Sequence, residues 1–191
     1  MRLWSVQKLG FYDDLIKNGI AYCTRLSDFA KDEEIAYRWM IKQMMERIGV
    51  PPLHEIRMPV WAWYQYSSKK CNKPPLSPKV KSYPEEKEMM IEFEAPNNLV
   101  LLSDYMLWHH PLNYWDICRD KQKAKLVDKY FHTEFKEKPV EIQKLIMESW
   151  DVLFDLDFRD RYIAPKHKKN RPIQATLWCI KKEWVVSAVE F

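Results

Sequence analysis

The residues best suited to chemistry gather in Ser103–Trp115, which reads SDYMLWHHPLNYW. This stretch supplies a carboxylate, two imidazoles and an amide, from Asp104, His109, His110 and Asn113. An imidazole is the usual general base near neutral pH because its pKa lies within that range. We therefore predict that His109 acts as a general base, with Asn113 beside the ligand, in a wet pocket whose walls are aromatic.

The same stretch has a structural alternative. In that case Asp104 caps a short turn, Trp108 and Leu112 pack in the core, and both histidines lie at the surface. A shared metal ion is not expected, since His109 and His110 are adjacent, and adjacent side chains point apart on a helix or a strand. The sequence also has no His-Glu-x-x-His motif and no third ligand at a recognised spacing, so we predict no metal site.

A second group of polar side chains lies in Gln174–Trp178 (QATLW), which we predict to be a strand. Side chains alternate along a strand, so Gln174 and Thr176 share the face opposite Ala175 and Leu177. An amide and a hydroxyl at this spacing would orient a sugar or an amide group, although neither is an acid or a base near neutral pH. The alternative is the outward polar face of an edge strand.

Three further polar side chains lie on predicted strands, namely Ser5 and Gln7 on the first strand and Gln65 within VWAWYQ. We place all three around the same cleft as ligand-binding groups. The aromatic residues next to Gln65 would either stack on a ligand or fill the core.

Glycine is scarce, with three residues in the chain of 191. The GxGxxG and GxxxxGK[ST] phosphate cradles of Rossmann and P-loop proteins cannot be written with these glycines, nor can kinase glycine loops or GxSxG elbows. Any nucleotide must therefore be held by side chains and strand ends, for which nine Trp and ten Tyr provide stacking surfaces.

The four cysteines are scattered without a Cys-x-x-Cys pair, so we expect free thiols in a reducing cytoplasm. No apolar run resembles a signal peptide or reaches the length of about 18 residues that a membrane-spanning helix needs. We therefore expect a soluble cytoplasmic protein with no membrane partner.

Positive charge is concentrated in two segments, although the formal net charge is only +4. Residues 67–87, rich in Ser, Pro and Lys, are predicted to form a mobile loop, and residues 166–171 are also basic. Their lysines would either attract phosphates or nucleic acid, or only keep two surface loops in water. The lysines assigned to nucleic acid are Lys69, Lys70, Lys73, Lys168 and Lys169.

Alternation of apolar residues predicts one α+β domain over residues 1–191, with mostly antiparallel sheets. The spacing of apolar residues predicts about three helices, over 11–18, 33–48 and 139–153, and Asn18-Gly19 predicts the C-terminal cap of the first. Strands are predicted over 3–7, 20–25, 60–66, 89–93, 99–102, 173–180 and 184–189.

Four aromatic-rich motifs follow one another along the chain. They are RLWSVQ (Arg2–Gln7), PVWAWYQ (Pro59–Gln65), LLSDYMLWH (Leu101–His109) and IQATLW (Ile173–Trp178). Together they resemble an uncharacterised family of small bacterial proteins, a domain of unknown function, over nearly the whole chain. The resemblance implies a bacterial origin and a single domain, and it implies no reaction.

A first strand, a short helix ending in LIKNGI (Leu15–Ile20) and a further strand resemble the opening of mono-ADP-ribosyltransferase folds. In that family the first strand offers Arg or His, where this chain has Ser5. The closing QATLW is similar to the family's [EQ]-x-E strand, with Gln174 in the first position and Thr176 in place of the catalytic glutamate. Because that glutamate stabilises the developing oxocarbenium charge, the resemblance implies weakened or different chemistry.

The resulting hypothesis is an ADP-ribosyltransferase-like domain that binds a nucleotide such as NAD between its sheets and has a nucleic-acid or protein acceptor. Its catalytic residues would be His109, Gln174 and Thr176, and its cofactor-binding residues Ser5, Gln7, Gln65 and Asn113. The alternative is a non-catalytic interaction module that holds a protein or single-stranded nucleic acid through aromatic strands and lysine-rich loops. Whether the chain is an enzyme is left open by its sequence.

Overall fold

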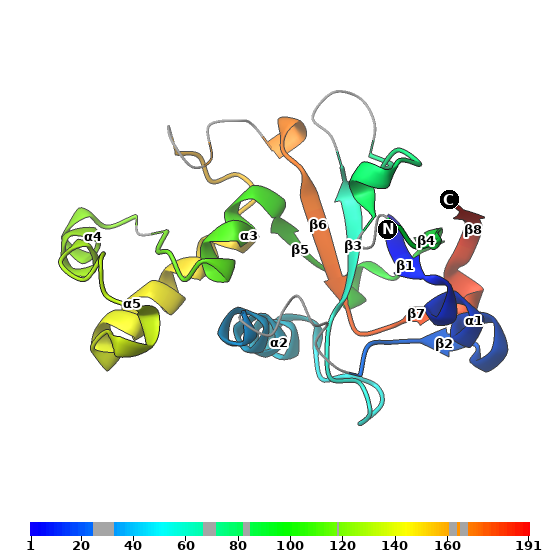
Figure 1. Cartoon of the computed structure of the whole chain (residues 1–191), viewed down its shortest axis with the longest axis horizontal. Helices are drawn as coiled ribbons and strands as arrows, with labels where there is room; N and C mark the ends of the chain where they lie inside the picture. Colours follow the sequence, from blue (N-terminus) through cyan, green and yellow to red (C-terminus); the bar gives the residue numbers. More distant parts are fainter. Residues whose placement is uncertain (25–32, 67–71, 82–84, 118, 161–163, 165–167) are drawn as a thin grey trace.

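A six-stranded antiparallel sheet forms the centre of the molecule (Figure 1). The computed structural model describes residues 1–24, 33–66, 72–81, 85–117, 119–160, 164 and 168–191. The strand order is β5-β6-β3-β1-β4-β8, and a separate two-stranded sheet pairs β2 with β7. The strands are β1 (Arg2–Lys8), β2 (Ile20–Ala21), β3 (Val60–Gln65), β4 (Glu88–Glu94), β5 (Leu101–Asp104), β6 (Ile173–Leu177), β7 (Ile180–Lys181) and β8 (Val185–Glu190).

The register of the strands decides which side chains share a face. Trp63 lies opposite Gln174, and Gln174 lies opposite Ser103, so these three side chains are on one face of the sheet. Trp4 lies opposite Trp63, which places the neighbouring Ser5 on the other face. We call these the tryptophan face and the serine face.

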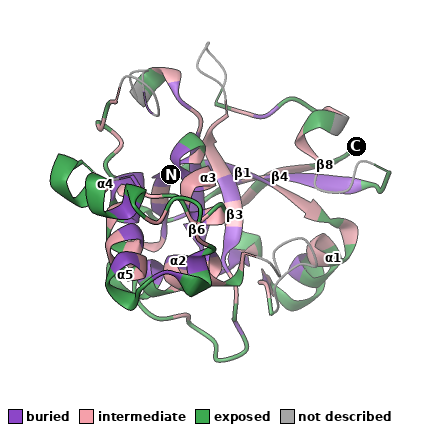
Figure 2. Ribbon diagram, turned by 60° about the vertical axis from the view of Figure 1, so that its left-hand side comes forward, coloured by how far each residue is buried: buried purple, intermediate pink, exposed green. Residues whose placement is uncertain are grey.

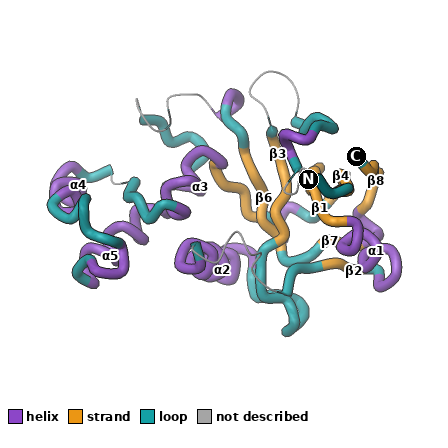
Figure 3. The backbone as a smooth tube through the Cα atoms, in the orientation of Figure 1, coloured by secondary structure: helices purple, strands orange, loops and turns teal. Residues whose placement is uncertain are grey.

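Five α-helices lie among the described residues, on both sides of the sheet (Figure 3). They are α1 (Leu9–Asn18), α2 (Glu34–Ile48), α3 (Tyr105–Leu112), α4 (Lys121–Asp128) and α5 (Val140–Ser149). Helices α2, α3 and α5 pack in one apolar cluster with Leu101 and Trp61 of the tryptophan face. Leu15 of α1 packs in a second cluster with Leu3 and Ala62 of the serine face. The sheet therefore separates two hydrophobic cores.

The predicted α+β class and antiparallel sheet are confirmed. The predicted cap of the first helix is also confirmed, because Gly19 has a φ of 77° and its N–H donates to the Leu15 carbonyl at 3.0 Å. The strand expected over 20–25 is present only as Ile20–Ala21, followed by an isolated bridge from Cys23 to Met58, and residue 25 lies outside the described residues.

The estimate of about three helices was too low, because α3 and α4 were missed. Helix α3 has eight residues and contains Pro111, a residue that usually ends a helical pattern. Helix α4 buries only Val127, so it has no apolar stripe to reveal it. In the predicted loop 67–87, the described part contains a 3₁₀ helix, Pro78–Val80, while 67–71 and 82–84 lie outside the described residues.

Candidate functional site

A hollow of about 450 Å³ opens where β3 ends, β6 begins and α3 begins. Its volume falls within the range of about 300 to 1,000 Å³ that is usual for small-molecule sites. The lining residues are Trp63, Tyr66, Lys79, Val80, Lys81, Tyr105 and Pro172. We call this hollow the aromatic pocket.

The walls of the aromatic pocket are rings in contact with one another. The ring centroids of Trp63 and Tyr66 are 5.0 Å apart at an interplanar angle of 85°, and those of Trp63 and Tyr105 are 4.9 Å apart at 57°. The His109 ring meets Tyr105 edge to face, with centroids 5.0 Å apart. Aromatic faces of this kind stack on the flat rings of bases in a way that tolerates any base.

The charged groups among the described residues of the aromatic pocket are both lysines. The Lys79 ammonium has no hydrogen bond or ion pair with any described residue, and its residue is exposed. Lys81 donates to the Glu86 carbonyl at 2.8 Å and lies 5.3 Å from the Phe191 ring. The described residues that line the pocket include no Asp or Glu, so the site is suited to an anionic group.

Two buried polar side chains lie on the sheet next to the pocket. Gln174 is 5% exposed and is paired on one side with Trp63, a wall of the pocket, and on the other with Ser103, which is fully buried. The Gln174 amide nitrogen Nε2 and the Ser103 Oγ have no hydrogen-bond partner among the described residues. Buried polar atoms are nearly always paired, so these two are unusual.

A buried ion pair holds the N-terminus of α3 beside the start of β6. Asp104 Oδ2 lies 2.9 Å from Arg171 Nη1, while Asp104 Oδ1 accepts from the backbone N–H groups of Met106 and Leu107. Arg171 Nη2 also donates to the Leu156 carbonyl. These contacts place Tyr105 against Pro172, where the Tyr105 N–H donates to the Pro172 carbonyl at 3.1 Å.

Gln65 also contacts the segment that contains Arg171, so its amide nitrogen is not free to bind a ligand. Its Nε2 donates to the Arg171 carbonyl at 2.6 Å. Gln65 is thus close to the aromatic pocket, next to Tyr66, but its amide nitrogen fixes the backbone of the 168–172 segment.

His109, the predicted general base, is half-buried on α3 beside the pocket wall. Its Nδ1 lies 3.1 Å from the Tyr105 carbonyl oxygen, which only accepts hydrogen bonds, so Nδ1 carries the proton. Nε2 is then the nitrogen able to take up a proton. Asn113 ends α3 and donates to the His109 carbonyl at 2.8 Å, so its amide nitrogen stabilises the helix end.

The remaining predicted site residues do not share this pocket. Thr176 is fully buried, with Oγ1 3.4 Å from the Leu101 carbonyl. Ser5 and Gln7 lie on the serine face, where Ser5 Oγ donates to the Trp61 carbonyl and Gln7 Nε2 donates to Ser5 Oγ. The sheet therefore separates Ser5 and Gln7 from Gln174, and no single cleft surrounds all the predicted residues.

The structural alternative for Ser103–Trp115 describes much of this region. Asp104 caps α3, and Trp108 is 4% exposed in the core. The two histidine rings do point to different partners, since His110 Nδ1 lies 3.0 Å from the Asp116 carbonyl oxygen. Both histidines are half-buried and not fully at the surface.

Sequence reasoning missed Tyr66 and Tyr105 as pocket residues and left Lys79 and Lys81 unassigned within a basic segment. Of the lysines it assigned to nucleic acid, Lys69 and Lys70 lie outside the described residues, as does the side chain of Lys168. Lys73 lies 3.4 Å from Glu92, and Lys169 is exposed. The sequence therefore showed that this segment is rich in lysine, but it could not show which side chains lie next to those lysines in the folded protein.

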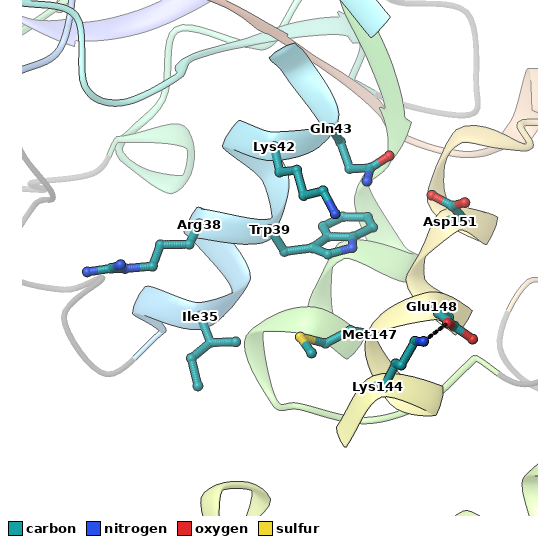
Figure 4. A pocket seen from close by; sticks show the side chains of 9 residues that line it. All are labelled: Ile35, Arg38, Trp39, Lys42, Gln43, Lys144, Met147, Glu148 and Asp151. Atoms are coloured by element: carbon teal, nitrogen blue, oxygen red, sulfur yellow. Dashed lines mark ion pairs between the residues drawn. The ribbon is translucent and has the colours of Figure 1, made fainter. Parts of the chain in front are cut away.

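A second hollow, of about 500 Å³, lies between α2 and α5 (Figure 4). Trp39 points into it from α2 and Met147 from α5, and Trp39 also packs against Trp150 and Phe154. Its rim charges are paired, as in the Lys144–Glu148 pair at 3.8 Å. This larger hollow is mainly apolar and is less suited than the aromatic pocket to a charged ligand.

In the part of the chain that the structure describes, no three His, Cys, Asp or Glu side chains are placed to hold a metal ion. The described helices also include none that could span a membrane. Cys23 and Cys179 are free thiols, and Cys71 and Cys118 lie outside the described residues.

The fold and the pocket together define an α+β protein with an antiparallel sheet and an aromatic, lysine-bearing pocket where α3 begins. The chain belongs to the family described as a domain of unknown function, DUF3841, which matches residues 2–186. The family resemblance carried by the four motifs is therefore confirmed. No curated protein and no solved structure matches the chain, so the similarity to ADP-ribosyltransferase folds stays a prediction.

Proposed function

We propose that the aromatic pocket binds a phosphate-bearing nucleotide. One observation carries the proposal, namely three aromatic side chains and two lysines around a hollow of about 450 Å³, with no acidic residue among the described residues of its lining. The base would stack on Trp63 or Tyr105, and the phosphates would pair with Lys79. NAD and ADP-ribose are the first ligands to test, because both join a flat ring to phosphates.

Binding is better supported than transfer of ADP-ribose. The lining, as far as its residues are described, offers no carboxylate to stabilise an oxocarbenium ion, and Asp104 is already held by Arg171 and the α3 backbone. Thr176 is buried and would reach a substrate only after a rearrangement. Transfer therefore stays a prediction, with His109 Nε2 as its candidate base, and release of nicotinamide from NAD is the measurement that tests it.

Binding is tested by thermal unfolding with NAD, ADP-ribose or ATP, followed by calorimetry. A ligand at about 100 times its Kd stabilises a folded protein by about 2.7 kcal/mol. Lys79→Ala removes a charged contact and should weaken binding about tenfold or more. Lys144→Ala, in the second hollow, is the matched control and should bind as the parent does. The proposal is wrong if no nucleotide stabilises the protein or if Lys79→Ala binds unchanged.

Single-stranded nucleic acid is a second candidate ligand for the same pocket. The supporting observation is the exposed Lys79, which pairs with no described residue, beside rings that meet edge to face, an arrangement suited to a base and its adjoining phosphate. A longer oligonucleotide would then bind more tightly than a mononucleotide, and its affinity would fall steeply with salt. Equal affinities for the two would exclude this candidate and leave the free nucleotide.

A further inference from the structure

Helix α4 and the turn after it form a basic and partly apolar surface far from the aromatic pocket. We define the α4 surface as Lys121, Lys123, Lys125, Leu126, Lys129 and Phe131, all of them exposed. The helix lies at the end of the molecule opposite β8 and the C-terminus (Figure 1), and much of it is coloured as exposed in Figure 2.

The geometry of α4 directs Lys121, Lys125 and Lys129 away from the protein, whereas Lys123, four residues before Val127, lies on the side that faces α5. Val127 is the one buried residue of the helix, so the direction of Val127 marks the side that packs on the protein. Lys125 and Lys129 each lie two residues away from Val127, about 200° around the helix axis, and thus on its far side. Lys121 is four residues before Lys125 and extends the same row.

The lysines of the α4 surface have no ion-pair partner within the described ranges. Two lysines on other helices do have such partners, in the pairs Lys42–Glu46 of α2 and Lys144–Glu148 of α5. The nearby Asp120 carboxylate accepts from the backbone N–H groups of Gln122 and Lys123 at the start of α4. Three lysines on α4 and a fourth directly after it outnumber the two acidic residues of the same segment, Asp120 and Asp128, so the surface keeps a positive potential.

Two large apolar side chains lie among these lysines. Phe131 is 70% exposed and Leu126 is 44% exposed. Lysines around exposed aromatic and aliphatic side chains are the composition of helices that lie in a membrane interface, and clusters of four to eight cations bind anionic lipid headgroups. A nucleic-acid backbone would occupy the lysines but would give the leucine no apolar partner.

We propose that the α4 surface binds anionic phospholipid membranes. The lysines contact the headgroups, and Leu126 and Phe131 enter the boundary between headgroups and acyl chains. This is contact with a membrane surface, for which no apolar span is required. It is independent of the nucleotide proposal, because the α4 surface and the aromatic pocket share no residue.

The test is co-sedimentation of the whole chain with two kinds of vesicle, phosphatidylcholine alone and phosphatidylcholine mixed with phosphatidylglycerol. Each lysine near an anionic surface contributes a factor of about five in affinity. The double variant Lys125→Gln/Lys129→Gln should therefore bind the mixed vesicles about 25-fold more weakly. Lys42→Gln/Lys144→Gln, with the same change in net charge on exposed and paired lysines, should bind much more like the parent.

The apolar contribution is tested separately with Phe131→Ala. This variant should lose affinity for the mixed vesicles and keep the salt dependence of the parent, because it changes no charge. The proposal is overturned if the chain binds neither kind of vesicle or both equally, or if the two lysine variants lose the same affinity. It is also overturned if the Lys125/Lys129 substitutions weaken binding only to a single-stranded oligonucleotide.

Discussion

Asp104 and Arg171 form an ion pair of 2.9 Å in which the side chains are only 1% and 4% exposed. The pair joins the residue that caps α3 to the segment that enters β6. Both sides of the aromatic pocket therefore depend on it, since Tyr105 follows Asp104 and Pro172 follows Arg171.

Arg171→Leu should destabilise the protein strongly. It leaves the Asp104 carboxylate buried without its counter-charge, and breaking a buried pair in this way costs about 3 to 5 kcal/mol. Urea unfolding at neutral pH measures the loss. Arg38→Leu is the control, because the Arg38–Glu34 pair is exposed and such pairs contribute about 0 to 1 kcal/mol. Equal losses in the two variants would mean that Asp104 gains no stability from Arg171.

Acid should reduce stability partly through Glu92. Burial raises the pKa of this carboxyl, but the Lys73 ammonium at 3.4 Å and the Arg2 guanidinium at 3.6 Å outweigh burial, and the pKa in the folded protein is below the usual 4.5. A lowered carboxyl pKa gives stability that is present above the unfolded value and is lost as the pH falls through the folded value. Urea unfolding of Glu92→Gln should therefore show a shallower acid decline than the parent.

Glu94→Gln is the matched control for Glu92→Gln. Glu94 is on the same strand and binds Arg2 at 2.9 Å, but its side chain is 56% exposed, against 14% for Glu92. If both variants lose stability in acid along the same curve, the contacts of Glu92 do not explain the acid sensitivity.

His110 should titrate below the usual histidine pKa of 6.5. Burial lowers its pKa, and the hydrogen bond to the Asp116 carbonyl only partly opposes this effect. The unfolded chain therefore takes up this proton first as the pH falls, so His110 contributes stability above pH 6.5 that is lost in mild acid. Proton NMR of the imidazole gives the midpoint directly, and a midpoint above that of a model peptide would contradict the structure.

The alternation of residues along the strands predicted the sheet well but could not predict its faces. Trp61, Trp63 and Gln174 share one face because of the register between β3 and β6, and a strand's own sequence does not contain its register. Ser5 was grouped with Gln174 for that reason, although the sheet separates them. The tryptophans divide similarly, since Trp61 packs on Trp108 in the core and Trp63 lines the pocket.

The aromatic pocket could be predicted only in part, because it is made of segments that are distant in the chain. Trp63 belongs to a strand that was predicted, whereas Tyr105 begins a helix that was not. The Asp104–Arg171 pair joins two segments with no local signal for each other. The spacing of apolar residues predicts one helix or strand at a time, so it cannot predict contacts that depend on how these elements pack together.

Gln174→Met should stabilise the protein in the absence of ligand. The Gln174 amide nitrogen is buried without a hydrogen-bond partner among the described residues, and such a group costs about 1 to 3 kcal/mol. Methionine has a similar shape and no polar atom to leave unpaired. Urea unfolding should therefore give a free energy of unfolding about 1 kcal/mol above that of the parent.

Gln43→Met provides the contrast, because Gln43 is a buried glutamine whose amide nitrogen and oxygen each have a hydrogen-bond partner. Its Nε2 lies 3.3 Å from Glu46, and its Oε1 accepts from Arg47 Nε at 3.0 Å. Removal of these bonds should lower the free energy of unfolding, so the two substitutions are expected to change it in opposite directions. If Gln174→Met is destabilising as well, the Gln174 amide nitrogen has a hydrogen bond to a water molecule before any ligand binds.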